Sequence, residues 1–233
     1  MGSAPSTRPP VLRSLTRFWS DDKGLSVFSA ALLVVIFVMP PLLAGSGGRS
    51  LPGDVAFAIL LVSGVLALSD RGLARKVLLP FALLTVAIDL GSWLVPVPPL
   101  LVRGTGLLAL LLLLAVVLFQ TLRGGPITVH RIQGGVAAYL LIGVAWAHAY
   151  SLVALLRPGA FSGAASAADG ARAFLYFSFV TLTTVGYGDV LPVHPAARSL
   201  AMLEAVTGPL YLAILLARLV SLAVAPGGRA REG

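Results

Sequence analysis

Thr183-Thr184-Val185-Gly186-Tyr187-Gly188-Asp189 is the most informative part of the chain. It follows an aromatic-rich segment and lies between two long apolar segments. Residues 184–188 can turn all their carbonyl oxygens to one side if the backbone alternates between right- and left-handed conformations. Gly186 and Gly188 stand where a positive φ would otherwise be costly, because glycine has no Cβ. The stretch therefore predicts an oxygen-lined strand, with a glycine-rich turn in a re-entrant loop as the alternative.

The sequence TTVGYGD at residues 183–189 resembles the selectivity filter of the potassium channel family, and the match is complete. Rings of carbonyl oxygens in such filters replace the water around a dehydrated potassium ion. The resemblance implies that K+ binds at Thr184, Val185, Gly186 and Tyr187. Gly188 completes the filter. It also implies supporting roles for Thr183, Asp189, Tyr176 and Phe177. No cofactor is expected besides the permeant K+.

The composition indicates a membrane protein that crosses the bilayer several times. Of the 233 residues, 58% are apolar and 11% are charged, and the mean hydropathy is +0.95. There is no Cys, which excludes disulfides and thiolate metal sites. The net charge of +8 suggests nucleic-acid binding, but the basic residues lie at the ends of apolar runs. They are better explained as topology signals, and no nucleic-acid partner is expected.

Apolar runs predict six membrane helices, at residues 25–44, 54–68, 76–95, 100–122, 134–156 and 197–224. The fold class is therefore an all-α membrane protein with six transmembrane helices and a re-entrant pore helix and filter between the fifth and sixth. We expect four parts: a cytoplasmic tail (1–24), a four-helix sensor-like domain (25–123), a pore domain (124–224) and a short cytoplasmic tail (225–233).

Lys and Arg near the span ends predict the orientation. With the amino terminus inside, twelve of these residues fall on the inner side and five on the outer side. Both termini are therefore expected to be cytoplasmic, in a multi-pass protein of the cell (plasma) membrane. The same orientation places residues 183–189 on the outer side, where the resemblance requires a filter.

The layout of four spans before a pore is similar to that of voltage-gated channels, but the residues differ. A voltage-sensing fourth helix carries Arg at every third position. Here Arg103 and Arg123 flank an uncharged run at residues 104–121, so weak or absent voltage dependence is expected. Asp89 and Arg103 lie at similar depths on adjacent spans. Because a lone intramembrane charge is expensive, a structural ion pair is favoured over a gating role.

Residues 170–183 are too few to cross a membrane as a helix, and they resemble the pore helix of the same family. Asp169 is a good N-cap for it. We expect its aromatic residues to pack behind the filter strand: Phe174, Tyr176, Phe177 and Phe179. Some family members carry a Glu at the position of Val180, and that acid is absent here. In the fifth span, His148 is either a pH sensor or, as favoured, a neutral imidazole bonded to a neighbour.

The last span contains Gly208, at the spacing from Gly188 that the family's hinge glycine has, followed by Pro209. Proline removes one helix hydrogen bond, so a kink and a gating hinge are expected here. Three apolar residues below it recur every four positions: Leu212, Leu216 and Val220. They either form a dewetting gate or pack against lipid and other helices. Glu204 either lines the cavity or, as favoured, bonds behind the pore helix.

The sequence thus predicts a homotetramer in a lipid bilayer that conducts potassium ions passively and selectively, because one chain supplies one strand of a four-stranded filter. It predicts no enzyme, since its few buried titratable groups form no acid–base or metal constellation. Two alternatives stay open. A potassium transporter subunit normally carries four degenerate pore loops in one chain, and a non-conducting regulatory subunit would tolerate a damaged filter.

Overall fold

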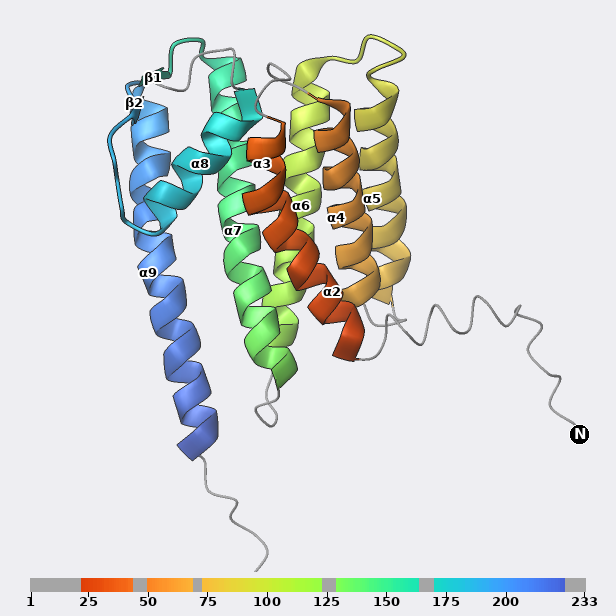
Figure 1. Cartoon of the computed structure of the whole chain (residues 1–233), viewed down its shortest axis with the longest axis vertical. Coiled ribbons are helices and arrows are strands. Elements are labelled where there is room, and N and C mark those ends of the chain that lie inside the picture. Colours follow the sequence, from red (N-terminus) through yellow and green to blue (C-terminus); the bar gives the residue numbers. More distant parts are fainter. Residues whose placement is uncertain (1–21, 44–49, 69–72, 123–128, 164–169, 225–233) are drawn as a thin grey trace, which may run out of the picture.

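The computed structural model describes residues 22–43, 50–68, 73–122, 129–163 and 170–224, which are mostly helical (Figure 1). The elements are, in chain order, α2 (Asp22–Leu33), η1 (Val34–Val38), α3 (Met39–Leu42), α4 (Leu51–Leu68), α5 (Leu73–Gly91), α6 (Pro99–Leu122), α7 (Val129–Leu156), β1 (Phe161–Gly163), α8 (Gly170–Leu182), β2 (Val190–Pro192) and α9 (Pro195–Val224). Asp169, Arg123, most of the predicted amino-terminal tail and all of the predicted carboxy-terminal tail lie outside the described residues.

A π-helical turn, η1, joins α2 to α3. Pro40 and Pro41 have no backbone N–H to donate to the carbonyls four residues earlier. The turn before them is widened, and the Met39 N–H bonds to the carbonyl of Val34. The two prolines then occupy the first turn of α3, where a missing N–H costs little. They therefore widen the helix without ending it at once.

The helices α2, α4, α5 and α6 stand side by side, and α7 separates them from α8 and α9 (Figure 1). The core of this four-helix unit consists of fully buried apolar side chains, among them Phe28, Leu60, Leu110, Leu113 and Val117. The short helix α8 is inclined between α7 and α9 at one end of the molecule (Figure 1). It therefore leads the chain into residues 183–189 with helices on both sides.

Within the described chain, four helical stretches are long and apolar enough to cross a membrane: Leu25–Leu42, Pro99–Leu122, Ile132–Leu156 and Pro195–Ser221. The helix α4 is apolar but shorter, and α5 carries Arg75 and Lys76 close to its start. Both lie in the same bundle as α2 and α6 (Figure 1). Four apolar helices agree with a membrane protein, and the six-span layout stays a prediction.

Large apolar side chains along α9 are not covered by the rest of the chain. Those exposed are Met202, Leu203, Val206, Leu210, Leu212, Ile214, Leu216 and Val220. An apolar surface of this length is unfavourable in water. We therefore expect lipid or further copies of the chain to cover α9.

The described chain is mostly helical, in agreement with the predicted helical fold class, and it adds one short pair of strands. The strands β1 and β2 form an antiparallel pair in which Ser162 faces Leu191. The sequence did not reveal this pair, because a three-residue strand is too short to show a periodic pattern. The pair matters because β2 begins directly after Asp189.

Candidate functional site

The backbone of residues 183–189 alternates between negative and positive φ angles. Three of its residues have positive φ: Thr184 (60°), Gly186 (58°) and Gly188 (79°). This alternation is what turns successive carbonyl groups to one side of a strand. The sequence reasoning anticipated the two glycines but missed Thr184, which is the only non-glycine residue with positive φ in the described ranges. For a β-branched residue this conformation is a genuine outlier, and such strain persists mainly at functional sites.

The end of α8 holds the start of this segment. The Thr184 N–H donates to the carbonyl of Thr181 at 2.9 Å. The N–H groups of Val185 and Gly186 both donate to the carbonyl of Val180, at 3.0 and 3.3 Å. These bonds use carbonyls that a helix end leaves without intrahelical partners. The partially negative end of α8 therefore lies at the beginning of the segment.

Every residue from Thr183 to Asp189 is exposed in the single chain. Val185 is 52% exposed and Tyr187 is 71% exposed. The carbonyls of residues 184–188 and the Thr184 hydroxyl are the oxygens with which this segment could hold a dehydrated cation. One chain supplies them from one side only, so a closed coordination shell requires further copies.

Asp189, at the end of the segment, is bonded to two neighbouring residues. Its carboxylate accepts hydrogen bonds from the Tyr176 hydroxyl of α8 and, at 3.1 Å, from the Val190 N–H. Gly163 of β1 lies opposite Val190, and a Cβ at Gly163 would lie 2.0 Å from the Asp189 carbonyl oxygen. The structure thus brings Tyr176 and Asp189 together and adds Gly163. No local sequence signal identified that glycine.

We predict that Gly163→Ala shifts Asp189 and destabilises the protein by about 2 kcal/mol or more, since the new Cβ would meet backbone that cannot rotate away. Gly163 has a φ of +86°, which adds conformational strain. Gly159→Ala is the matched control, because Gly159 has a φ of +80° but a Cβ there would have no atom of the described chain within 4 Å. Thermal unfolding would measure the stability of both variants, and size-exclusion chromatography would show whether each remains a folded, unaggregated protein. Equal losses would mean that strain alone matters and that the contact with Asp189 does not.

Aromatic rings from α7, β1 and α8 pack together beside this segment: Tyr150, Phe161, Phe174 and Phe177. The ring centroids of Tyr150 and Phe177 lie 4.9 Å apart. Phe179 packs elsewhere, directly over Gly143 of α7, where a Cβ would come within 2.7 Å of its ring. The four pore-helix aromatics predicted to act together are therefore divided among a buried cluster, the Gly143 contact and the Tyr176–Asp189 bond.

Glu204 of α9 is fully buried behind α8. It accepts a hydrogen bond from the Tyr150 hydroxyl of α7. The Ser178 hydroxyl of α8 lies 2.5 Å from Glu204 Oε1 and 2.7 Å from the carbonyl oxygen of Gly143. The Glu204 carboxyl group thus links α9 to both α7 and α8. The sequence left two positions open for Glu204, lining the pore cavity or bonding behind the pore helix. In the single chain its carboxyl group lies behind α8 and is bonded to Ser178.

Gly208 contacts the end of α8 more closely than any other residue type could. A Cβ at this position would lie 1.9 Å from the carbonyl oxygen of Leu182. The helix α9 continues through Pro209 to Val224. Gly208 is therefore the point at which α9 touches the last residue of α8. The predicted hinge at Gly208 and Pro209 stays a prediction, and this contact is a role that the sequence did not reveal.

The predicted gate residues follow Gly208 along α9. Leu212, Leu216 and Val220 are all exposed in the single chain. Both roles considered for them, a gate or a packing surface, need partners outside the single chain.

Asp89, Arg103 and His148 lie apart from residues 183–189, on the wall of one cavity where the four-helix unit meets α7 and α8. His148 Nδ1 lies 3.0 Å from the carbonyl oxygen of Val144, and its ring stacks on Phe57 with centroids 4.9 Å apart. The imidazole is thus bonded to a neighbour, which is the alternative that the sequence favours. The Asp89–Arg103 ion pair stays a prediction.

Comparison with known proteins finds one family model and two relatives that match part of the chain. A family model described as an ion channel matches residues 138–225. Residues of this chain are 37% identical over 84 residues to two pore potassium channel c of Oryza sativa subsp. japonica, covering 36% of this chain and 17% of that protein. They are 33% identical over 93 residues to the inward rectifier potassium channel Kirbac3.1 of Paramagnetospirillum magnetotacticum, covering 38% of this chain and 27% of that protein.

The chain thus spans about a sixth to a quarter of the length of these curated relatives. The matched family and both relatives are ion channels and not enzymes. The similarity includes most of α7, all of α8, residues 183–189 and α9. The family match does not include α2, α4, α5 and α6, whose role must be argued from their own residues.

Proposed function

We propose that the protein is a potassium-selective channel whose filter is formed by residues 183–189 of four identical chains. The alternation of positive and negative φ at Thr184, Gly186 and Gly188 is the observation that carries this proposal. A backbone with this alternation turns its carbonyl groups to one side, and here it occurs in the stretch that matches TTVGYGD. The similarity of residues 138–225 to an ion-channel family supports the same function.

A homotetramer accounts for the surfaces that the single chain leaves uncovered. Residues 183–189 and the apolar side chains of α9 are exposed. Four copies around one axis would place four sets of carbonyls around an ion and would bury these side chains between subunits. Selectivity would then come from the number and spacing of the oxygens that replace the ion's water.

The helix α8 would contribute electrostatically. Its carboxyl end lies at the start of residues 183–189, and four such ends would place partial negative charge beneath the filter. With the predicted orientation, both termini are cytoplasmic and the Asp189 end of the filter faces outward. No covalent chemistry is required, because ions move passively down their electrochemical gradient.

Ion flux through purified protein in liposomes tests the proposal. We expect rubidium or potassium uptake that sodium does not support, and single-channel openings in a planar bilayer. Gly186→Ala should abolish selective flux while leaving the tetramer intact, because a Cβ at a φ of 58° strains the filter backbone although no described atom lies within 4 Å. Silence of the wild-type tetramer would favour a non-conducting subunit, and equal sodium and potassium flux would contradict a selective filter.

We also predict a nearly linear current–voltage relation in symmetrical potassium. The helix α6 has Arg103 near one end and no further charge through residue 122. One elementary charge moving through 100 mV gains only about 2.3 kcal/mol, so steep gating would need several more charges in each subunit. A voltage ramp on single channels measures this. Steep voltage dependence that persists without blockers would show that α2–α6 sense voltage by another route.

A further inference from the structure

The turn between α5 and α6 contains the most exposed large apolar side chain of the described residues. Leu94 is 89% exposed and Val95 is 62% exposed. Trp93 before them and Leu100 and Leu101 after them are exposed as well. These five residues form the hairpin tip, at the end of the molecule where α7 leads toward β1 (Figure 1). An exposed apolar surface of this kind usually marks a contact with a partner or a membrane.

The hairpin tip has no charge. No charged residue lies between Asp89 and Arg103, and the polar side chains of that stretch are bonded within the protein. The Ser92 hydroxyl donates to the Asp89 carbonyl oxygen at 2.6 Å, and Trp93 Nε1 donates to Asp54 Oδ2 at 2.8 Å. Moving the tip out of water therefore strands neither a charge nor a polar side chain without a partner.

The backbone of the turn has few N–H groups that need water. Those of residues 92–95 donate to carbonyls at the end of α5 over 2.9 to 3.2 Å, and those of residues 101 and 102 donate to the Pro98 carbonyl at 2.9 and 3.3 Å. Pro96, Pro98 and Pro99 have no N–H at all. Unsatisfied backbone groups are what excludes most loops from a bilayer. This turn is thus unusually well suited to leave water.

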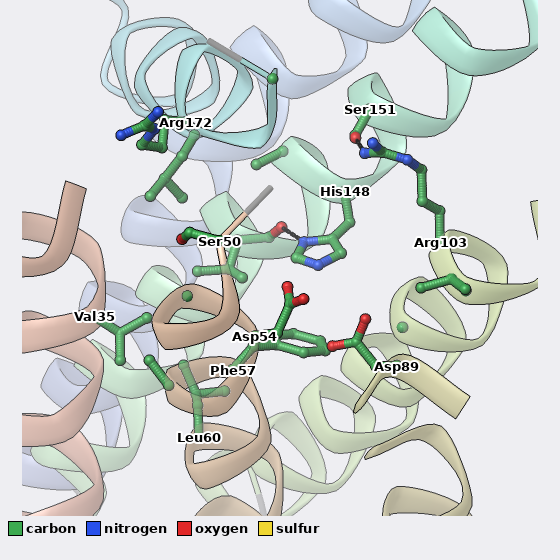
Figure 2. Close-up of a pocket in the computed structure, with 18 of the residues that line it drawn as sticks. Val35, Ser50, Asp54, Phe57, Leu60, Asp89, Arg103, His148, Ser151 and Arg172 are labelled. Atoms are coloured by element: carbon green, nitrogen blue, oxygen red, sulfur yellow. Dashed lines mark hydrogen bonds between the residues drawn. The ribbon is translucent and has the colours of Figure 1, made fainter. Parts of the chain in front are cut away.

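The charged residues beside the turn face the interior of the protein. Charged side chains of several helices line a cavity of about 530 Å³, and Figure 2 shows Asp54, Asp89 and Arg103 among them. Arg103 donates there to the Ser151 hydroxyl of α7. None of the five residues of the hairpin tip lines this cavity. The hairpin therefore has a polar inner face and an apolar outer face.

The length of α5 limits how far the tip reaches. Lys76 lies near the start of α5, which is the inner end in the predicted orientation. From Lys76 to Gly91 a helix rises about 22 Å, whereas the hydrocarbon core of a bilayer is about 30 Å thick. With Lys76 at the inner boundary, α5 ends about 8 Å below the outer boundary. The turn therefore begins at a depth where lipid surrounds the protein.

We propose that the hairpin tip inserts into the outer leaflet of the lipid bilayer, with its aliphatic side chains among the acyl chains and the Trp93 ring at the level of the headgroups. Tryptophan favours that level, and the remaining carbonyls of the turn can accept hydrogen bonds there from headgroups and interfacial water. A further copy of the chain fits less well as the partner. The proposed tetramer has α9 at its axis, and α7 separates α9 from the four-helix unit (Figure 1).

Insertion would connect the outer leaflet to the four-helix unit. The bond of Trp93 to Asp54 ties the turn to α4, and α6 runs from the turn along α7. A change in the thickness of the leaflet would therefore act on helices that pack against α7. Any effect of such a change on ion flux rests on the proposed function, whereas insertion itself does not.

Site-directed spin labelling tests insertion, because the chain has no Cys. Leu94→Cys places the label on the tip of the full-length protein in phosphatidylcholine liposomes. Arg157→Cys is the control for water, since Arg157 is exposed and directly follows α7 at the same end of the molecule. Leu84→Cys is the control for lipid, since Leu84 is exposed in the middle of α5. The measured quantity is the accessibility of each label to oxygen, which collects in lipid, divided by its accessibility to a polar nickel chelate, which stays in water.

We expect this ratio at Leu94→Cys to approach that at Leu84→Cys and to exceed that at Arg157→Cys by about fivefold or more, because a polar solute is excluded from an apolar medium. Val95→Cys should give the same result, so that the outcome does not depend on the folding of one variant. A ratio as low as that of Arg157→Cys would place the tip in water. Low accessibility to both reagents would mean that protein covers it. Either result would overturn the proposal.

Lipid charge gives a further test. Adding phosphatidylglycerol to the liposomes should leave the ratio unchanged, because attraction to anionic lipid requires basic residues and none lies in residues 90–102. Insertion that occurs only with anionic lipid would contradict an apolar contact. Spin-label accessibility does not depend on ion flux. A protein whose tip is inserted but that does not conduct would therefore contradict only the proposed channel function, and a conducting protein whose tip lies in water would contradict only this inference.

Discussion

Gly208→Ala is expected to prevent assembly of a stable, conducting protein. The new Cβ would lie 1.9 Å from the carbonyl oxygen of Leu182 and 2.9 Å from its carbonyl carbon. Both atoms belong to the backbone at the end of α8, so no side-chain rotation relieves the overlap. Either α9 or the start of residues 183–189 must move. We expect a loss of about 3 kcal/mol or more in stability and loss of selective potassium flux, measured by thermal unfolding and liposome uptake.

Gly104→Ala is the matched control for this prediction. Gly104 is also a helical glycine, in α6, and a Cβ there would have no described atom within 4 Å. Alanine there should leave flux unchanged and should stabilise the helix by about 1 kcal/mol or less. If Gly208→Ala behaves like this control, the contact between α9 and α8 has no energetic importance. Normal assembly with altered opening would instead support the hinge that the sequence predicts.

Local signals in the sequence place two of the helices well, one in the four-helix unit and one before residues 183–189. A long apolar run predicts a helix at residues 100–122, and the structure has α6 at Pro99–Leu122. A segment too short to cross the membrane, before TTVGYGD, predicts a helix at residues 170–183, and the structure has α8 at Gly170–Leu182. Both predictions rest on residues adjacent in the chain, which is why they need no tertiary information.

Features that depend on contacts between distant segments were not predictable. Gly163 and Gly208 are required by the approach of backbone from elsewhere in the chain, and sequence alone shows only that they are glycines. The positive φ of Thr184 conflicts with the preference of a β-branched residue, so only the surrounding fold can impose it. The charged cavity joins single residues from five helices, and no spacing in the sequence connects them.

The role of Glu204 could be predicted only in part from the sequence. Its place inside an apolar span shows that it must be functional or bonded, because a buried charge is expensive. Helical periodicity cannot tell which face of α9 turns toward a pore. The hydroxyls of Tyr150 and Ser178 decide the matter by contacting its carboxyl group from two other helices.

Glu204→Ala is therefore expected to destabilise the protein by about 3 kcal/mol or more. The change leaves the buried Tyr150 hydroxyl without its carboxyl partner, and an unsatisfied buried group costs about 1–3 kcal/mol. The Ser178 hydroxyl loses the same partner but can still donate to the Gly143 carbonyl. It also leaves a cavity behind α8. Thermal unfolding of the purified protein measures the loss. Thr207→Ala on the same helix is the control, because the Thr207 hydroxyl is exposed and bonds only locally to the Leu203 carbonyl at 2.7 Å.

Glu204→Gln separates a structural role from a conduction role. Glutamine keeps the shape and one acceptor oxygen, but its amide nitrogen cannot accept a bond from a hydroxyl. We expect fewer or shorter openings in single-channel records, with unitary conductance unchanged, because the carboxyl group contacts α8 and not the permeant ion. Combining Glu204→Ala with Tyr150→Phe should cost less than the sum of the single changes, since both remove the same bond. A selective fall in unitary conductance would place Glu204 in the ion pathway, and additive losses would show that its bond to Tyr150 does not hold α7 and α9 together.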